Sequence, residues 1–403
     1  MEFLLFLILV GAVLGFFVIP HLRRRKAVKA ATQGLSRSED QRAYGFVPVD
    51  ELDVRLPGPD PELVEALDET QRTQDWRPVA QLLALTGDDY ELRWQRVQSL
   101  AGAAAMELAQ ARAAGVPVDT TEPASSGISF SKAPQEGAQG AQGALGAQPQ
   151  DARWLRNWRS EQPQDPGGAQ VYAQFLVWQA LAYPGSADHR IILEEARNVA
   201  HEAARLADAD PTPYITELFI ARSLSYRKVD FEALWHQVTR RARTHMGAHL
   251  AALPYWSEKW HGSRDEAYGF AQSAAASAPP GSLLPALPLF AVYDHLPEVD
   301  LVRGMYQSKV VEDAIEAAEF AVDSVADDHP VRPHVVHLLL CFLVRAERYD
   351  EAMEALRMVD GYVGAVPWVN SGNPAGEYAS YRALAVAGFE GQGGNPAATP
   401  PAY

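Results

Sequence analysis

The chain has little cysteine and no excess of positive charge. Each shortage excludes a structural feature or a class of binding partner. Its single cysteine, Cys341, excludes a disulfide within one chain and fits a reducing compartment. Acidic residues outnumber basic ones by 51 to 35, so the body of the chain is acidic. No basic stripe with interleaved aromatic residues is present that could follow a phosphate backbone, and we therefore expect no nucleic-acid binding.

Recognisable catalytic motifs are also missing from the sequence. It contains no phosphate-binding loop, no dinucleotide-binding glycine pattern and no nucleophile elbow. Cys341 lies inside the apolar run VVHLLLCFLV, which is typical of a buried, unreactive thiol rather than of a nucleophile. We therefore predict no catalytic residue, no cofactor and no bound metal.

Strand patterns are absent as well, because no stretch alternates apolar and polar residues over the length of a strand. Apolar residues instead recur at helical spacing through most of the chain, in segments separated by short turns. The sequence therefore predicts an all-α protein built from antiparallel helical hairpins.

One long apolar run lies near the N-terminus. Residues from Phe3 to Ile19 carry no charge, and the length of this run is at the short end of what spans a bilayer. A cleavable signal peptide would carry basic residues before the run, whereas here Glu2 precedes it and the basic residues follow. These are Arg23, Arg24, Arg25, Lys26 and Lys29. Since cationic flanks stay on the cytoplasmic side, we expect an uncleaved single-pass anchor with its N-terminus outside, a cytoplasmic C-terminal domain, and basic residues against anionic lipid headgroups.

Changes in composition along the chain predict six segments. Two of them lack an apolar period and are rich in small residues, glycine or proline. The segments are a transmembrane anchor (1–22), a basic juxtamembrane segment and tether (23–59), an N-terminal helical segment (60–115), a disordered low-complexity linker (116–150), a helical repeat domain (151–366) and a partly disordered C-terminal tail (367–403).

The stretch KWHGSRDEAYGFAQSAAASAPP predicts a turn and the helix that follows it. Gly262 supplies the turn, and Ser263 with Glu266 forms a capping box that starts the helix. Small side chains recur on one face of this helix, where they allow a second helix to approach closely. They are Ala267, Ala271 and Ala274.

The spacing of alanines predicts a repeat architecture. Three of them recur at intervals of 33 and 34 residues, and a further pair is again 34 residues apart. They are Ala200, Ala233 and Ala267, then Ala318 and Ala352. This is the tetratricopeptide period, and the segment RYDEAMEAL around Ala352 resembles the second helix of that repeat. The resemblance covers about residues 184–364 and implies a tetratricopeptide-like α-solenoid of stacked hairpins, without implying a ligand.

Three further segments resemble a bacterial domain family of unknown function that occurs in actinobacterial proteins, often behind a single membrane anchor. They read PYWSEKWHGSRDEAYGFAQSAAASAPPGS, LFAVYDHLPEV and VDGYVGAVPW. The resemblance implies a membrane-anchored helical protein. Because the family carries no assigned activity, it implies no site residue.

Aromatic residues are the best candidates for contacts with a partner. Tyr255, Trp256 and Trp260 lie near one predicted hairpin turn, and Trp368 lies in the segment VPWVNSGNP. Aromatic side chains are favoured both in cores and as binding anchors, and at helical spacing the core is the commoner place. Both interpretations stay open for these four residues.

Histidines support a second, less favoured hypothesis. His245 and His249 lie four residues apart, which on a helix can present two imidazoles to one metal ion, and His261 follows. The HExxH glutamate is missing and a glycine lies between the first two, so a structural or surface role is favoured. His334 and His337, three residues apart, also lack a neighbouring acidic motif.

These observations together predict a membrane-tethered cytoplasmic helical-repeat scaffold that binds or recruits an unknown protein partner at the inner membrane face. An acidic stack of repeats would prefer a basic or amphipathic segment of that partner. The alternative is a metal-dependent hydrolase that uses the histidines between His245 and His261.

Overall fold

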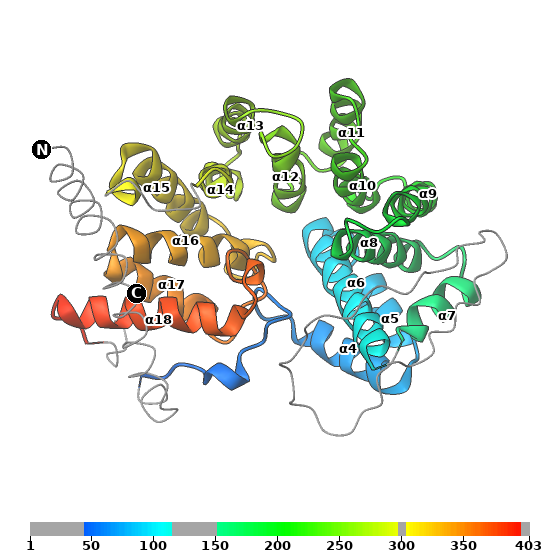
Figure 1. The fold of residues 1–403 in the computed structure, drawn as a ribbon, viewed down its shortest axis with the longest axis horizontal. Coiled ribbons are helices and arrows are strands. Elements are labelled where there is room, and N and C mark those ends of the chain that lie inside the picture. The colour runs from blue at the N-terminus through cyan, green and yellow to red at the C-terminus, as the bar shows by residue number, and fades with distance from the viewer. Residues whose placement is uncertain (1–43, 115–150, 297–303, 396–403) are drawn as a thin grey trace, which may run out of the picture. The chain divides into compact units, whose positions relative to one another are not determined.

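The computed structural model of the protein describes residues 44–114, 151–296 and 304–395. Across these ranges the protein is all-α, as the sequence predicts (Figure 1). The one β contact in them is a parallel bridge between Asp53 and Tyr362. Of the helices described, none is both long and apolar enough to cross a membrane. The predicted anchor (1–22), the basic residues at 23–29 and the predicted linker (116–150) lie outside the described residues.

The described chain divides into two compact units that are interleaved in sequence. The first, which we call the inserted unit, comprises residues 60–267. The second, which we call the two-segment unit, combines residues 44–59 with residues from 268 onward. The sequence analysis instead expected residues 60–115 to be separate from a repeat domain at 151–366.

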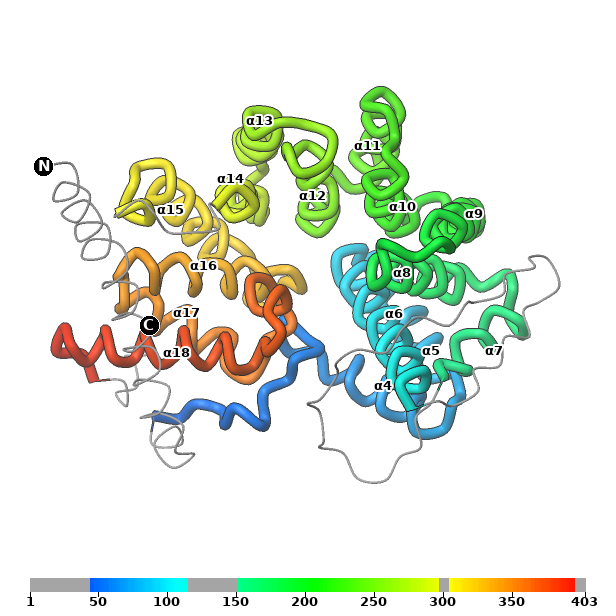
Figure 2. The backbone as a smooth tube through the Cα atoms, viewed as in Figure 1, coloured from blue at the N-terminus to red at the C-terminus, as the bar shows by residue number. Residues whose placement is uncertain are grey.

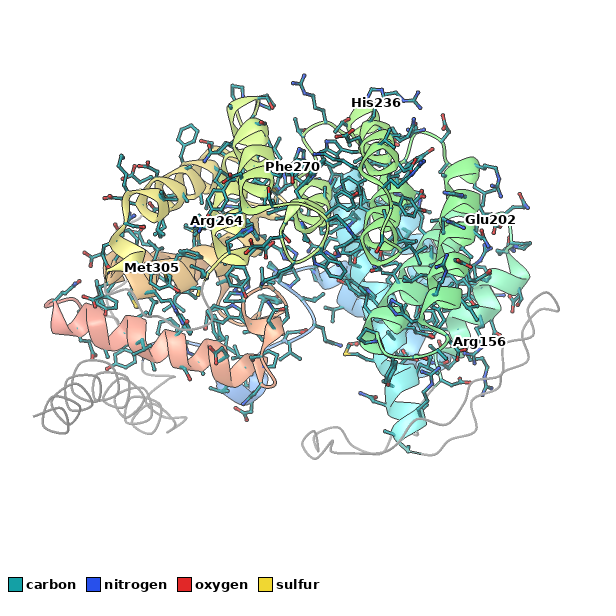
Figure 3. The ribbon with its side chains drawn as sticks, turned by 45° about the horizontal axis from the view of Figure 1, so that its top comes forward. Arg156, Glu202, His236, Arg264, Phe270 and Met305 are labelled. Carbon is teal, nitrogen blue, oxygen red and sulfur yellow. The ribbon has the colours of Figure 1, made fainter. Side chains whose placement is uncertain are left out.

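The inserted unit is a series of helices that pack on their neighbours in the chain (Figure 2). They are α4 (Pro61–Thr73), α5 (Arg77–Leu85), α6 (Tyr90–Ala113), α7 (Arg153–Glu161), α8 (Pro166–Ala182), α9 (His189–Leu206), α10 (Thr212–Ser223), α11 (Lys228–Arg241), α12 (Met246–Ala252) and the 3-10 turn η3 (Leu253–Trp256). Helix α6 also packs across α8, so the N-terminal helices belong to the same core. Arg159 of α7 donates to Glu202 of α9 at 2.9 Å, and Figure 3 labels this glutamate.

Aspartate caps explain where several of these helices begin. The carboxylates of Asp60 and Asp89 each accept a backbone N–H of the first helical turn at 3.0 Å, at the starts of α4 and α6. Helix α8 starts earlier than the apolar pattern from Val171 indicates. Asp165 caps it, and Pro166 at the first helical position has no N–H that needs a partner.

A proline interrupts one stretch whose apolar pattern fits a single helix. The pattern runs over residues 248–260, but α12 ends at Ala252 and η3 follows. Pro254 accounts for the break, because its ring blocks the helix and it has no N–H to continue the ladder. The next start is confirmed: α13 (Arg264–Ala276) begins after Ser263, whose hydroxyl accepts the N–H of Glu266 at 3.2 Å.

The two-segment unit contains α14 and four longer helices, each packed on the next. Its elements are η2 (Val49–Glu51), the part of α13 from Tyr268 onward, η4 (Leu284–Ala286), α14 (Leu287–Asp294), η5 (Met305–Gln307), α15 (Lys309–Ser324), α16 (Arg332–Ala346), α17 (Tyr349–Val359), η6 (Trp368–Asn370) and α18 (Pro374–Gly391). Helix α18 lies in the region expected to be a partly disordered tail. Asn373 caps it by accepting the N–H of Gly376 at 3.1 Å, so this part of the predicted tail is helical.

Residues 44–59, expected to be part of a tether, are packed against the other segment of their own unit. Phe46, Leu52 and Leu56 are buried. The backbone of Asp53 donates to the Gly361 carbonyl and accepts from Val363, both at 2.8 Å. An extended segment that pairs its backbone in this way needs no helical apolar period, which is why the sequence pattern did not reveal it.

The predicted burial of the regularly spaced alanines is confirmed at four positions and is wrong at one. Ala200, Ala267, Ala318 and Ala352 are buried, with at most 1% of their surface exposed. Ala233 is exposed, and its neighbour Leu234 is buried instead. The helix face at α11 is therefore displaced by one residue from the predicted repeat.

Candidate functional site

Four side chains of the inserted unit form a row that we call the aromatic ladder. Trp178 lies on α8, Phe219 and Arg222 lie on α10, and Trp260 follows η3. The rings of Trp178 and Phe219 meet edge to face with their centroids 5.7 Å apart. The guanidinium carbon of Arg222 lies 5.6 Å from the Phe219 centroid and 4.7 Å from the Trp260 centroid. These are favourable edge-to-face and cation–π geometries, so the four side chains support one another.

The aromatic ladder remains accessible to solvent. Trp178, Phe219 and Arg222 are half-buried, and 43% of Trp260 is exposed. Tryptophan and arginine are the side chains most enriched at binding hot spots, because they combine apolar area with polar contacts. The ladder is therefore a better candidate contact surface than any of the fully buried aromatic residues.

The loop after η3 fixes Trp260 beside α10. His261 Nε2 lies 2.8 Å from the Arg222 carbonyl oxygen, which can only accept, so the imidazole donates this bond. A Cβ atom at Gly262 would overlap the backbone carbonyl of Trp256, which explains the glycine that the sequence marks as a turn. His261 thus has a structural role in this loop.

Two of the predicted contact residues belong to the core. Only 2% of Tyr255 is exposed, its ring stacks on Phe231 at 3.6 Å, and its hydroxyl donates to the Tyr226 carbonyl at 2.7 Å. Trp256 is 9% exposed and meets Phe231 edge to face. Their burial leaves Trp260 as the one residue of this group with an exposed ring.

Trp368 is also fully buried, and it fixes the protonation of His337. The Trp368 indole N–H donates to Nδ1 of His337 at 3.0 Å, while Nε2 lies 2.8 Å from the Pro57 carbonyl and donates to it. One nitrogen accepts and the other donates, so this imidazole is neutral. Desolvation lowers the pKa of His337 to about 3, in agreement with that tautomer. Trp368 thus orients a histidine that holds the 44–59 segment.

The histidines proposed as metal ligands bond to the backbone instead. His245 caps α12 by accepting the Ala248 N–H through Nδ1 at 3.1 Å, and its Nε2 lies 3.1 Å from the Tyr90 carbonyl. His249 Nδ1 lies 2.9 Å from the His245 carbonyl, and burial lowers the pKa of His249 to about 4. Among the described residues no group of three or more His, Cys, Asp or Glu side chains could hold a metal ion. His334 is half-buried on α16, and desolvation lowers its pKa to about 4.

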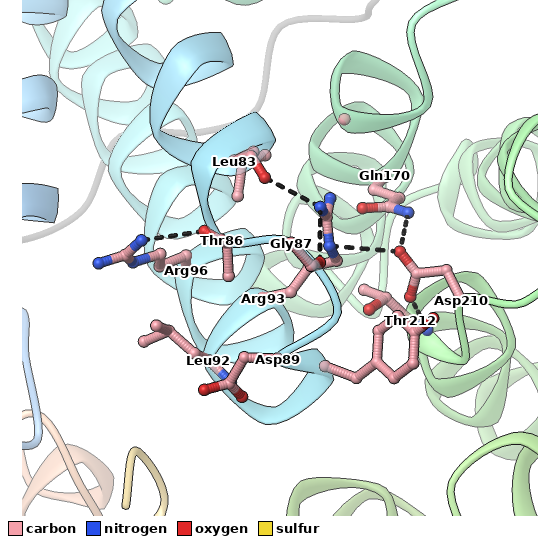
Figure 4. Close-up of polar contacts among 12 residues, drawn as sticks. Leu83, Thr86, Gly87, Asp89, Leu92, Arg93, Arg96, Gln170, Asp210 and Thr212 are labelled. Atoms are coloured by element: carbon pink, nitrogen blue, oxygen red, sulfur yellow. Dashed lines mark hydrogen bonds and ion pairs between the residues drawn. The ribbon is translucent and has the colours of Figure 1, made fainter. Parts of the chain in front are cut away.

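A buried polar network, which the sequence did not reveal, joins α6 to the N-terminal ends of α8 and α10 (Figure 4). Arg93 Nε lies 3.5 Å from a carboxylate oxygen of Asp210. The Gln170 amide donates to the same oxygen at 2.7 Å, and the Thr212 N–H donates to the other at 2.8 Å. The attraction between Arg93 and Asp210, together with the hydrogen bonds to Asp210, offsets the free-energy cost of removing these two charges from water. We therefore assign the network a structural role.

Glu91, two residues earlier on α6, accepts the Met246 N–H at 2.5 Å. Burial raises the pKa of Glu91 to about 8, so the acid is mostly protonated at neutral pH. His245 lies 3.7 Å away, and the two backbone bonds of its ring keep it neutral. The contact between them is therefore not an ion pair.

The sequence analysis identified one member of the aromatic ladder and missed three. Trp178, Phe219 and Trp260 are spaced by 41 and 41 residues, which differs from the 34-residue period used to align the alanines. A search for aromatic residues at one constant spacing would have detected these three. Arg222 carries no such signal, because only the packing of α10 beside the loop brings it between two rings.

Comparisons of the chain with models of known protein families, with curated proteins and with solved structures found no match.

Proposed function

We propose that this protein is a membrane-tethered helical-repeat scaffold that recruits a partner protein at the inner face of the membrane. The helical hairpins within each unit act as tetratricopeptide-like repeats. The apolar run from Phe3 to Ile19 anchors the chain, and the basic residues after it keep the helices on the cytoplasmic side. The resemblance to the actinobacterial membrane-anchored family supports the same assignment.

The aromatic ladder is the observation that carries this proposal. A row of partly exposed aromatic rings, with one arginine between two of them, provides apolar area and positive charge on α8, on α10 and in the loop after η3. A partner segment with an apolar face can pack against Trp178 and Trp260, with its polar or acidic side towards the positive charge of Arg222. We therefore propose that the partner's contact segment is amphipathic.

Affinity capture from the native cells tests the role of the ladder. The full chain is compared with Trp260→Ala and Phe219→Ala, and truncation of a binding hot spot of about 2 kcal/mol reduces affinity about 30-fold. The control is Trp76→Ala, because Trp76 also lies under an arginine, Arg77, at 5.3 Å in the same unit but outside the ladder. Selective loss of one captured protein in the two ladder variants supports the proposal. Equal recovery from all four proteins contradicts it.

Membrane topology needs a separate experiment. A reporter that is active only in the cytoplasm is fused after Tyr403, and we expect activity in the membrane fraction. Removal of residues 1–22 should release that activity into the soluble fraction. Activity of a reporter that works only outside the cytoplasm would reverse the proposed orientation.

A further inference from the structure

Helix α15 of the two-segment unit presents apolar side chains to solvent. Four large apolar side chains of the described residues are more than half exposed, and two of these, Val310 and Phe320, lie on α15. Phe320 is 66% exposed, more than any other aromatic side chain in the described ranges. An exposed phenyl ring that is surrounded by charged residues is a common feature of contact surfaces.

Three carboxylates lie beside Phe320 on this helix. Glu316 precedes Phe320 by four residues and Asp323 follows it by three, and these spacings place side chains on the same side of a helix. Glu312 lies one turn before Glu316. All three are exposed, and within the described parts of the chain they form no ion pair. We call Phe320 and these three carboxylates the α15 face.

The negative charge of the α15 face is not balanced on its own helix. Lys309, the one basic residue of α15, donates to Asp313 at 2.7 Å. Glu312 and Glu316 have like charges at a spacing at which they repel each other. Asp323 lies in the last helical turn, where the backbone carbonyls already carry partial negative charge and no basic residue is present. A cationic ligand would therefore relieve an unfavourable arrangement of charges.

A segment of the same chain has the complementary charge. Within residues 23–29, which lie outside the described ranges, the basic residues are Arg23, Arg24, Arg25, Lys26 and Lys29. Val28 adds an apolar side chain between the two lysines. This segment, which we call the basic segment, thus combines cations with an apolar residue, as the α15 face combines carboxylates with a phenyl ring.

The basic segment is close enough in sequence to reach α15. Lys29 precedes Tyr44 by 15 residues, and the Tyr44 hydroxyl donates to Glu390 of the two-segment unit at 2.9 Å. A chain of 15 residues spans at most about 50 Å. A unit of about 150 residues has a radius of gyration of about 15 Å. The tether is therefore long enough to bring the basic segment to α15 of the unit to which it is attached.

We propose that the α15 face is the docking site for the chain's own basic segment, with Phe320 against Val28 and the cations beside the three carboxylates. Attachment to the same chain favours this ligand over a separate protein. A tether of this length gives an effective concentration on the order of millimolar, at which a contact made of several weak surface ion pairs is populated. The docking goes beyond recruitment by the aromatic ladder, since it uses other residues in the other unit.

Zero-length cross-linking of the full chain in a neutral detergent tests the docking, because no lipid headgroup then competes for the cations. A water-soluble carbodiimide joins a lysine amine to a carboxylate when the two are in contact, and mass spectrometry of the digested protein identifies the joined residues. We expect Lys26 and Lys29 to be joined to the carboxylates of the α15 face. High salt should reduce the yield, because the ion pairs are exposed and are screened.

Two variants remove parts of the proposed contact and leave the reacting groups in place. Replacing Arg23, Arg24 and Arg25 together by glutamine removes three cations but no amine, and should lower the yield about tenfold. Phe320→Ala removes the apolar contact but no carboxylate, and should lower the yield several-fold. Met358→Ala is the matched control, because Met358 is a 45% exposed apolar side chain on α17 of the same unit. It should keep the yield of the wild type.

Chance contacts of the basic segment are measured at Glu354, an exposed carboxylate on α17. Coupling of the lysines to Glu354 as often as to the α15 face would overturn the proposal, as would an unchanged yield in either variant. A mixture of isotope-labelled and unlabelled protein shows which chain supplies the segment. Joined peptides that carry a single label support docking within one chain. Joined peptides that combine both labels in statistical proportion would assign the face to a second copy and overturn the proposal.

Discussion

Replacing Glu91 by glutamine should stabilise the protein at neutral pH, in a manner that depends on pH. Burial raises the pKa of Glu91 from 4.5 to about 8, and the acid accepts the Met246 N–H. In the unfolded chain it ionises above pH 4.5, whereas in the folded chain it stays protonated until about pH 8. Stability is therefore lost as the pH rises through this window and is constant above it.

The size of the effect follows from the same shift. At pH 7 the solution lies about 2.5 pH units above the unfolded pKa, which at about 1.36 kcal/mol per unit gives a ceiling of about 3 kcal/mol. Glutamine is uncharged at every pH and its amide oxygen can still accept from Met246. Glu91→Gln should therefore match the wild type near pH 4 and exceed its unfolding free energy by up to about 3 kcal/mol at pH 7.

Urea unfolding at pH 4.5, 7 and 8.5, followed by tryptophan fluorescence, measures this difference. Glu65→Gln is the control, because Glu65 is exposed on α4 and its replacement should leave the pH dependence unchanged. A difference between Glu91→Gln and wild type that stays constant across the three pH values would refute the reasoning, since it would show that burial does not hold this acid protonated.

Further expected outcomes concern packing and buried hydrogen bonds. Ala267→Leu should lower the unfolding free energy by about 1 to 3 kcal/mol, because Ala267 is fully buried, whereas Ala276→Leu at an exposed position should be nearly neutral; equal urea midpoints would contradict this. Trp368→Phe should cost about 1 to 3 kcal/mol by leaving Nδ1 of His337 without its donor, and a neutral result in the same assay would contradict it. Because the pKa of His337 is lowered to about 3, its contribution to stability should be lost as the pH falls from 6.5 towards 3, and a His337→Gln variant should show a flatter acid limb in urea unfolding.

Local signals predicted much of the helical structure. The capping box at Ser263 marks a helix start because a side chain next to an apolar pattern acts on its own backbone. The burial of Ala267 and Ala352 follows from helical spacing for the same reason. Where the helix-forming signal lies within a few residues, the sequence alone suffices.

Long-range contacts were not predictable in the same way. Segment 44–59 looks like a tether because its apolar residues have no period, yet its backbone pairs with residues 361–364, far away in sequence. Arg222 becomes a candidate site residue only when another element brings the ring of Trp260 beside it. The fold class was therefore accessible from the sequence, whereas most of the candidate site was not.

The pairing of segment 44–59 with the C-terminal helices also constrains the order of events during synthesis. Val47 donates to the carboxylate of Asp360, a partner that is 313 residues further along the chain. At about 5 to 20 residues per second, a ribosome needs about 15 to 60 s to reach that partner. Throughout this interval Phe46, Leu52 and Leu56 lack the surface that buries them, whereas the inserted unit has all of its own residues once residue 267 has been made. The inserted unit can therefore fold on the ribosome first, and the N-terminal segment is the part of the described chain that most needs a chaperone until translation ends.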